Sequence, residues 1–285
     1  MSWNIIELSD PDFLSISKYI TANFGLKLPM IKKILIQSRL QLRLQELKMN
    51  SFSQYRKLLE NPETREQELK MITNYVSTNK TSFFREEAHF SILGKQILPE
   101  LFRLLERNGD PFLRCWSAGC SSGQEAFSIA MMLEEYRLLW HRQIDFQIYA
   151  TDISSKVLSQ GRRAVFPYDQ VNTVPLSYRK LFLLKSKNQL NRQIKVCQAL
   201  RKRVFFSYGN LMDEQYAFNY LFDFIFIRNT LIYFQSDRQK QILNRLIRYL
   251  KPAGYLFVGH AESLIHMDLP LKIIAPGIYQ KITKL

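Results

Sequence analysis

The stretch that decides the fold is RCWSAGCSSGQEAFS, residues 114–128. It runs from an apolar strand through two glycines, Gly119 and Gly123, into a helix whose apolar spacing continues through Leu133. A strand, a glycine turn and a helix N-terminus present backbone N–H groups to a nucleotide-like ligand in doubly wound α/β sheets. The same turn occurs in many α/β proteins without a ligand, so the rest of the chain has to agree.

The spacing of these glycines excludes the two commonest phosphate-binding loops. The stretch has no Gly-x-Gly-x-x-Gly, and it lacks the lysine of a phosphate-cradling loop. It therefore favours a nucleoside ligand without phosphates, and S-adenosyl-L-methionine is the leading candidate.

Apolar segments that alternate with helical patterns follow this turn and predict a mostly parallel sheet. The segments that indicate strands are 146–150, 204–208, 222–227 and 255–259, with a closing hairpin within 272–282. Asp152 follows the second strand, where a Rossmann-type site holds ribose hydroxyls. Ser236-Asp-Arg-Gln239 predicts a capping box that opens a helix through Tyr249, and residues 251–254 are expected to separate that helix from the next strand.

The first 75 residues show no strand pattern and predict a small all-α domain. Within it, residues 31–44 form an amphipathic helical pattern with Arg39 and Arg43 one turn apart. Residues 76–82 are a polar linker, and residues 90–105 predict a helix before the first strand. We expect residues 76–285 to form one α/β domain, a size that buries a large core.

The charge of the chain is uneven. The net charge is +15, and residues 155–205 hold twelve Lys and Arg against the single acid Asp169, a net +11. A basic region of this kind is typical of a phosphate-binding footprint or of a solvated surface.

Membrane spans, signal peptides and metal sites are not expected. No run of about 18 apolar residues is present, and the N-terminus lacks the basic region of a signal peptide. The chain has three cysteines and four histidines: Cys115, Cys120, Cys197, His89, His141, His260 and His266. The cysteines are odd in number and not spaced for zinc, and the histidines form no ligand pattern, so we predict a cytoplasmic protein without a metal.

Five motifs in order carry a resemblance to a known family. They are NKTSFFRE at 79–86, WSAGCSSGQE at 116–125, ATDI at 150–153, FDFIFIRN at 222–229 followed by IYF at 232–234, and GHAESL at 259–264. Together they resemble the chemotaxis-receptor glutamate O-methyltransferases, the CheR family, over roughly residues 13–282. The resemblance implies a class I, Rossmann-like methyltransferase sheet with a small β-insert at about residues 168–203, preceded by the helical domain.

The resemblance also implies the reaction and its residues. S-adenosyl-L-methionine would methylate glutamate side chains on the acidic cytoplasmic helices of chemoreceptors. Arg85 and Tyr233 match positions near the transferred methyl, where a guanidinium fork and a phenol orient a carboxylate. The basic helix with Arg39 and Arg43 is implied to meet the receptor. The cofactor-binding candidates are Asn79, Thr81, Arg85, Gly119, Glu125, Asp152, Asn210, Leu211, Arg228 and Asn229.

Several candidates also have a purely structural interpretation. Ser122-x-x-Glu125 fits a capping box, Asp152 fits a helix N-cap, Arg85 fits a surface ion pair and Tyr233 fits a core position. For the whole chain, the alternatives are a nucleic-acid methyltransferase, favoured only by charge, and a non-catalytic module that binds the cofactor product as a signal.

The chain departs from the family pattern at three places. Gln124 stands where an acid is usual, and Ala253 stands where a glycine is usual. Residues 184–191 of the insert contain no glycine, whereas some members grip a receptor's C-terminal peptide through a glycine-containing turn there. We therefore expect no C-terminal pentapeptide tether, and instead a direct electrostatic encounter of the basic surface with acidic helices.

Overall fold

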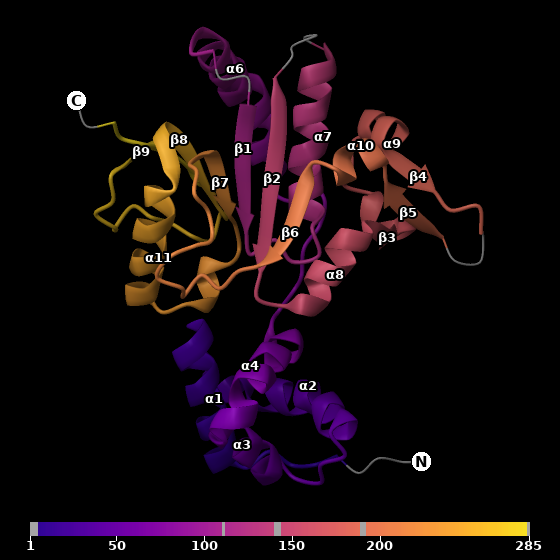
Figure 1. Ribbon diagram of the computed structural model, residues 1–285, viewed down its shortest axis with the longest axis vertical. Coiled ribbons are helices and arrows are strands. Elements are labelled where there is room, and N and C mark those ends of the chain that lie inside the picture. The colour runs from indigo at the N-terminus through magenta and orange to yellow at the C-terminus, as the bar shows by residue number, and fades with distance from the viewer. Residues whose placement is uncertain (1–4, 110–111, 140–143, 189–191, 284–285) are drawn as a thin grey trace.

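The computed structural model describes residues 5–109, 112–139, 144–188 and 192–283. Two parts lie one above the other in Figure 1: a small helical bundle at the N-terminus, and a larger α/β part. Residues 189–191, within the glycine-free segment of the insert, lie outside the described residues. No helix in the described ranges is long and apolar enough to cross a membrane.

A seven-stranded sheet forms the centre of the α/β part. Its strands, in spatial order, are β6 (Val204–Tyr208), β2 (Asp145–Asp152), β1 (Phe112–Ala118), β7 (Phe222–Ile227), β8 (Leu250–Val258), β10 (Ile278–Lys281) and β9 (Leu271–Ala275). The first five pair in parallel, and β10 pairs antiparallel with both β8 and β9. This order confirms the expected class I methyltransferase sheet with its closing antiparallel hairpin.

Helices cover both faces of the sheet, because its central strands are apolar on both sides. Every residue of β7 is buried, as the run FDFIFI requires. One face packs against α6 (Leu98–Arg107), α7 (Gln124–Leu139) and α8 (Ser155–Arg163), and the other packs against α11 (Ser236–Arg248). The predicted helix over residues 90–105 forms as α5 (Glu87–Ile92), a π-helical turn η2 (Leu93–Ile97) and α6.

The insert forms a small sheet of its own, beside α8 in Figure 1. Three antiparallel strands, in the order β3-β5-β4, make up this sheet. The insert elements are β3 (Val165–Pro167), η3 (Tyr168–Val171), α9 (Leu176–Phe182), β4 (Leu183–Lys185), β5 (Gln193–Val196) and α10 (Gln198–Arg201).

The N-terminal bundle has a separate hydrophobic core. Its elements are α1 (Asp10–Phe24), η1 (Met30–Lys32), α2 (Lys33–Glu46), α3 (Phe52–Glu60) and α4 (Pro62–Val76). Three of these helices start at a side-chain cap: Ser9 for α1, Ser51 for α3 and Asn61 for α4. The expected amphipathic helix over residues 31–44 is present as η1 and α2.

Two expectations around α11 are wrong. The N-cap residue of α11 is Gln235, and no side chain caps the helix, so Ser236 does not open a capping box. The segment 251–254 does not separate the helix from a later strand, because β8 already begins at Leu250. The register of β8 against β7 shifts there, and Ala253 takes a φ of 58°, so the four residues bulge within the strand.

The bundle docks on the carboxyl ends of the parallel strands, which point toward it in Figure 1. The backbone N–H of Lys27 donates to the Tyr233 carbonyl at 2.8 Å, and the Asn210 amide donates to the Asn23 carbonyl at 2.8 Å. The Asn74 side chain, on α4, accepts from the backbone N–H of Lys156 at the start of α8. The bundle therefore covers the edge of the sheet at which open α/β folds bind ligands.

Candidate active site

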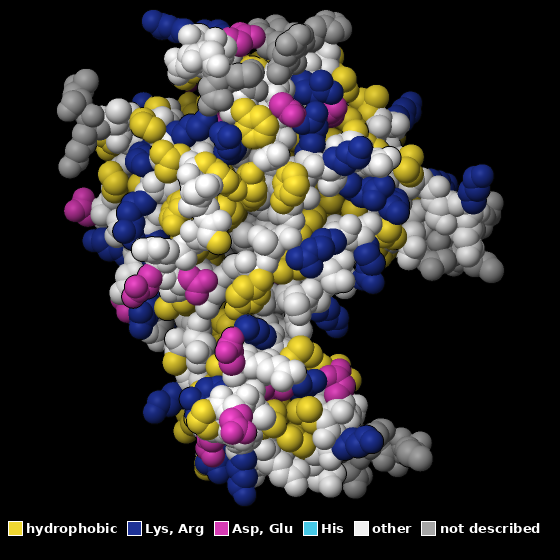
Figure 2. Space-filling model, viewed as in Figure 1, with side chains coloured by type: hydrophobic (Ala, Val, Ile, Leu, Met, Phe, Trp, Pro, Cys, Tyr) yellow, Lys and Arg dark blue, Asp and Glu magenta, His cyan; other side chains and the backbone are white. Residues whose placement is uncertain are grey.

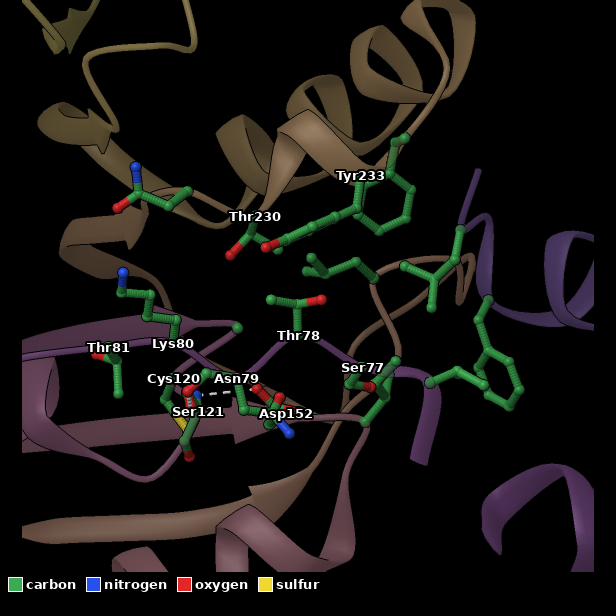
Figure 3. Close-up of a pocket in the computed structure, with 18 of the residues that line it drawn as sticks. Ser77, Thr78, Asn79, Lys80, Thr81, Cys120, Ser121, Asp152, Thr230 and Tyr233 are labelled. Atoms are coloured by element: carbon green, nitrogen blue, oxygen red, sulfur yellow. Dashed lines mark hydrogen bonds between the residues drawn. The ribbon is translucent and has the colours of Figure 1, made fainter. Parts of the chain in front are cut away.

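A cleft lies between the bundle and the carboxyl ends of the strands. All the cofactor-binding candidates inferred from the sequence line it, together with Tyr233 and Arg39. In Figure 3 the linker residues from Ser77 to Thr81 form one wall, and Thr230 and Tyr233 lie across the cleft from them. The structure thus gathers residues that are spread over most of the chain.

The glycine turn after β1 brings backbone close to the cleft. Gly119 has a φ of +76°, and a Cβ at this position would lie 2.5 Å from the Thr230 Oγ1 atom. The N–H groups of Gly119 and Cys120 both donate to the Thr151 carbonyl, at 2.8 and 2.9 Å. Only glycine fits here, because a side chain would be strained and would push Thr230 out of the cleft wall.

Asp152 ends β2 and ties together the two loops beneath the cleft. Its Oδ2 accepts from the Ser121 backbone N–H and its Oδ1 from the Ser154 backbone N–H, both at 2.9 Å; the Ser121 bond is drawn in Figure 3. Ser154 is the N-cap of α8, so the plain N-cap interpretation of Asp152 is wrong. Burial raises the pKa of the Asp152 carboxyl, and these backbone donors oppose the rise.

Glu125 lies in the first turn of α7 and faces a buried guanidinium. Its Oε1 accepts from the Ser117 hydroxyl at 2.7 Å, and its Oε2 is 3.5 Å from Arg228 Nη1. The Ser122 hydroxyl donates to Gln124, and among the described residues Ser122 and Glu125 form no capping-box hydrogen bond to each other's backbone. Burial raises the pKa of Glu125, against the effects of Arg228 and Ser117. A ligand with a cationic group would lower that pKa again.

Arg228 is the centre of a buried network rather than a free cation. Its side chain is 1% exposed. Besides Glu125, the guanidinium donates to Glu86 Oε2 at 3.0 Å and to the Arg85 carbonyl. The network fixes the segment that carries Arg85 against the end of β7.

Arg85 and Tyr233 keep their functional groups available to the cleft. The Arg85 guanidinium donates to the Lys80 carbonyl at 3.1 Å and has no acidic partner within the described ranges, which argues against a surface ion pair. Tyr233 is half-buried, with Lys32 Nζ 5.9 Å from its ring centre. Its hydroxyl has no hydrogen-bond partner among the residues that the structure describes, so the core interpretation does not fit.

The loop after β7 is held in place by one carboxylate. Glu262, which is 6% exposed, accepts from the backbone N–H groups of Asn229, Gly259 and Ile232, at 2.7, 2.7 and 3.2 Å. Burial raises the pKa of Glu262 against these donors. Because Asn229 has a φ of 55°, this loop carries strain that Glu262 helps to hold.

The two arginines proposed for substrate recognition have different surroundings. Arg39 lines the cleft and donates to the carbonyls of Val76 and Ser77, so it ties α2 to the linker. Arg43 lies outside the cleft lining. Its side chain is 13% exposed and forms a two-point ion pair with Glu68, so its charge is compensated inside the bundle. Arg43 is poorly placed to meet an external partner.

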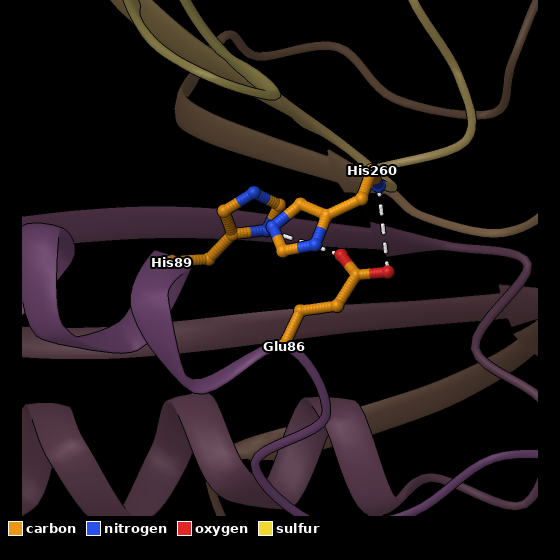
Figure 4. Close-up of side chains that lie close together, drawn as sticks. All are labelled: Glu86, His89 and His260. Carbon is orange, nitrogen blue, oxygen red and sulfur yellow. Dashed lines mark hydrogen bonds and ion pairs between the residues drawn. The ribbon is translucent and has the colours of Figure 1, made fainter.

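Sequence reasoning missed part of the site. Thr230 and the linker residue Thr78 line the cleft without having been expected to. Glu86, His89 and His260 lie together, as Figure 4 shows, and Glu86 is 3.0 Å from the Arg228 guanidinium. Burial and the nearby Arg228 guanidinium lower the pKa of His89 to about 4. The histidine spacing gives no signal for this cluster, because His260 follows a different strand.

The sheet order, the glycine turn and the polar cleft at the strand ends define a class I methyltransferase. A family model described as "CheR methyltransferase, SAM binding domain" matches residues 79–276. A second model, "CheR methyltransferase, all-alpha domain", matches residues 11–77. The chain therefore belongs to the CheR methyltransferase family, as the five motifs indicated, and S-adenosyl-L-methionine is its cofactor.

Relatives match over almost the whole chain. The chain is 38% identical to a chemotaxis protein methyltransferase of Borreliella burgdorferi, over 97% of this chain and 96% of the relative. It is 33% identical to chemotaxis protein methyltransferase 2 of Pseudomonas aeruginosa, over 94% and 92%. It is 31% identical to a chemotaxis protein methyltransferase of Escherichia coli, over 96% and 92%. The protein is thus an S-adenosyl-L-methionine-dependent methyltransferase, and no finding favours a nucleic-acid substrate or a non-catalytic module.

Proposed function

We propose that this methyltransferase esterifies glutamate side chains on the acidic cytoplasmic helices of chemoreceptors. The observation that carries the proposal is the pair Arg85 and Tyr233. Among the described residues, the Arg85 guanidinium has no acidic partner and the Tyr233 phenol has no acceptor. Both lie on the wall of a cofactor cleft, and both are donors suited to a carboxylate.

The cofactor fits the residues at the bottom of the cleft. The Asp152 carboxylate suits ribose hydroxyls, because each of its oxygens has one backbone donor and room for a further hydrogen bond. Glu125, whose pKa is raised, suits the cationic amino group of the cofactor's methionine part. Gly119 lines the cleft together with these two carboxylates.

The reaction needs orientation more than proton transfer. S-adenosyl-L-methionine supplies an activated methyl group on its sulfonium. A glutamate side chain has a pKa near roughly 4.3 and is ionised at neutral pH, so no general base is required. Arg85 and Tyr233 would hold the carboxylate in line with the methyl, and the docked bundle would exclude water from the cleft.

The basic surface suits an acidic partner. Most Lys and Arg side chains of the region 155–205 are exposed, and they gather over α8 and the insert in Figure 2. The exposed members are Lys156, Arg162, Arg163, Lys180, Lys185, Lys187, Arg192, Lys195 and Lys202. Such a surface would accelerate the encounter with acidic receptor helices by electrostatic steering.

The bundle is the proposed receptor-recognition domain, with residues 1–75 as its bounds and 76–285 as those of the catalytic domain. Ile31 in η1 and Ile34 at the start of α2 are 90% and 79% exposed. They lie beside Lys32, which lines the cleft. An amphipathic helix that carries acidic and apolar residues would fit this face. We further propose that no C-terminal receptor pentapeptide binds the insert, and that the protein acts in the cytoplasm.

Transfer of a tritiated methyl group tests the proposed function. Membranes that contain receptors of the same cell are incubated with the protein and labelled S-adenosyl-L-methionine. We expect incorporation that base releases as methanol, since a glutamate methyl ester hydrolyses in base. Label that withstands base would show methylation of nitrogen or another stable product and would refute the proposal.

Binding of a labelled C-terminal receptor pentapeptide tests the absence of a tether. We expect no saturable binding at any concentration at which the receptor itself is methylated. Saturable binding in the low micromolar range would show that the insert grips the peptide without a glycine.

A further inference from the structure

Glu86, His89 and His260 offer three ligand atoms to one point. Glu86 precedes α5, His89 is in the first turn of α5, and His260 follows β8. One nitrogen or oxygen from each side chain lies within 4.8 Å of the others, and the three side chains converge in Figure 4. The His89 Nδ1 atom is 3.4 Å from Glu86 Oε2.

The hydrogen bond on the far side of His89 decides which nitrogen holds the proton. His89 Nε2 is 3.1 Å from the Pro276 carbonyl oxygen, which can only accept. Nε2 therefore carries the hydrogen, and Nδ1 of the neutral ring presents a lone pair. Gly277, next to this carbonyl, fixes the arrangement, because a Cβ there would lie 2.7 Å from Nε2.

Without a cation, the surroundings of the Nδ1 lone pair cost free energy. The His89 ring is 0% exposed, and Nδ1 has no hydrogen-bond partner in the part of the chain that the structure describes. It faces a carboxylate oxygen, which is also an acceptor. A buried acceptor without a donor costs free energy, and two facing lone pairs repel each other. A proton or a metal ion between the two atoms removes both costs.

The distances suit zinc. Tetrahedral bonds of about 2.0–2.2 Å place neighbouring ligand atoms about 3.3–3.6 Å apart, and Nδ1 and Oε2 are 3.4 Å apart. His260 is exposed, so its ring can turn toward the same point, and water would complete the coordination. The Pro276 carbonyl on Nε2 is the kind of outer partner that orients a metal-binding histidine.

The local charge also leaves room for a divalent cation. Arg228 lies on Glu86 and would repel a metal ion. The same guanidinium is 3.5 Å from Glu125, so two carboxylates share one cation. Their excess negative charge favours a further cation.

We propose that Glu86, His89 and His260 bind one Zn²⁺ ion. The ion would join the start of α5 to the end of β8, behind the cofactor cleft and without contact to the transferred methyl. It would stabilise the Glu86 contact that holds Arg228 in place.

Metal titration of the full chain tests the site. Protein without a polyhistidine tag is stripped with a chelator and titrated with ZnCl₂ by calorimetry. We expect one equivalent per chain and a rise in melting temperature with Zn²⁺ concentration. With CoCl₂, we expect the visible absorption of tetrahedral Co²⁺.

Two histidine variants separate this site from chance surface binding. His260→Ala, at an exposed position, should fold normally and lose more than about tenfold in Zn²⁺ affinity. Even removing a residue that only hydrogen-bonds a metal ligand costs about tenfold, and a ligand should cost more. His266→Ala, also exposed, should keep the wild-type affinity. Unchanged affinity in His260→Ala would overturn the proposal. So would a stripped protein that binds no zinc.

Discussion

At the scale of single residues, the cleft depends on carboxylates whose oxygens face backbone donors or a buried guanidinium. Asp152 bridges the Ser121 and Ser154 backbone, and Glu262 holds three N–H groups of the loop beside Tyr233. Both carboxylates position a loop. Asp152 in addition is the proposed partner of the cofactor's ribose hydroxyls. Mutations at these residues therefore affect loop geometry and ligand binding together.

Asp152→Ala should weaken binding of S-adenosyl-L-homocysteine by about 1–3 kcal/mol, because the ribose hydroxyls and two backbone N–H groups lose their acceptor. Calorimetry measures the change. Asp169→Ala, at the exposed acid of the insert, is the matched control and should leave the affinity unchanged. Wild-type affinity in Asp152→Ala would remove the ribose role.

Tyr233→Phe and Arg85→Ala should separate chemistry from binding. Loss of one phenol hydroxyl should lower kcat while leaving cofactor affinity nearly unchanged. Loss of the guanidinium should abolish methyl transfer, because it orients the carboxylate. Single-turnover rates with saturating cofactor provide the comparison. Full turnover in Tyr233→Phe would show that its hydroxyl orients nothing.

Cofactor affinity should fall as pH falls through the raised pKa of Glu125. The cationic amine of the cofactor needs an ionised Glu125, and burial raises the pKa of this carboxyl. The loss should therefore begin at a higher pH than the ordinary glutamate value of roughly 4.3. Glu125→Gln should bind more weakly and with a flatter pH profile. An equally steep profile in Glu125→Gln would assign the titration to another group.

The sequence indicated most of the cleft residues but not how they are connected. The glycine turn after β1 is recognisable in the sequence, so the place of Gly119 and Glu125 near a ligand could be predicted. The same holds for Asp152 at the end of β2. The pairing of Glu86 with Arg228 could not, because 142 residues separate them and each is an ordinary surface residue type. For the same reason the contact of His89 with His260 had no local signal.

At the scale of elements, β8 contains an irregular stretch of backbone. Its residues 251–254 bulge within the strand, where a break between the helix and the strand was expected, and Ala253 has a φ of 58°. Periodicity predicted a strand at 255–259 correctly. It could not show that β8 already pairs with β7 at Leu250, before the bulge. The Gln280 side chain, which donates to the Ala253 carbonyl at 2.9 Å, helps to hold the bulge.

Ala253→Gly should stabilise the protein by about 1 kcal/mol, because glycine adopts positive φ without the clash of a Cβ. Chemical denaturation measures the free energy of unfolding. Ala130→Gly, in the middle of the buried helix α7, is the control and should destabilise. A destabilised Ala253→Gly would mean that the Cβ contacts at this position outweigh the backbone strain.

At the scale of the whole molecule, the bundle and the sheet domain build one cleft between them. Composition and pattern predicted both parts. How they dock could not be predicted, because it depends on single polar contacts such as Lys27 to Tyr233 and Asn210 to Asn23. These contacts join the bundle to the loops that carry the proposed chemistry.

Receptor methylation should slow steeply as salt rises, because exposed charges are screened beyond about 10 Å at 0.1 M. Reversing the exposed charges Lys180, Lys185 and Lys187 to Glu should lower the rate at low salt and flatten the salt dependence. Lys240→Glu, on α11, is the control. A triple variant with the wild-type rate and salt profile would show that the insert does not face the receptor.

The most direct test of the central claim is to map the methylated positions on a purified chemoreceptor cytoplasmic fragment by tandem mass spectrometry. With S-adenosyl-L-methionine and the wild-type protein, we predict methyl esters on glutamate side chains of the receptor helices, and none with Arg85→Ala. Methyl groups on nitrogen, or an unmodified fragment together with methylated nucleic acid from the same cell, would contradict the account.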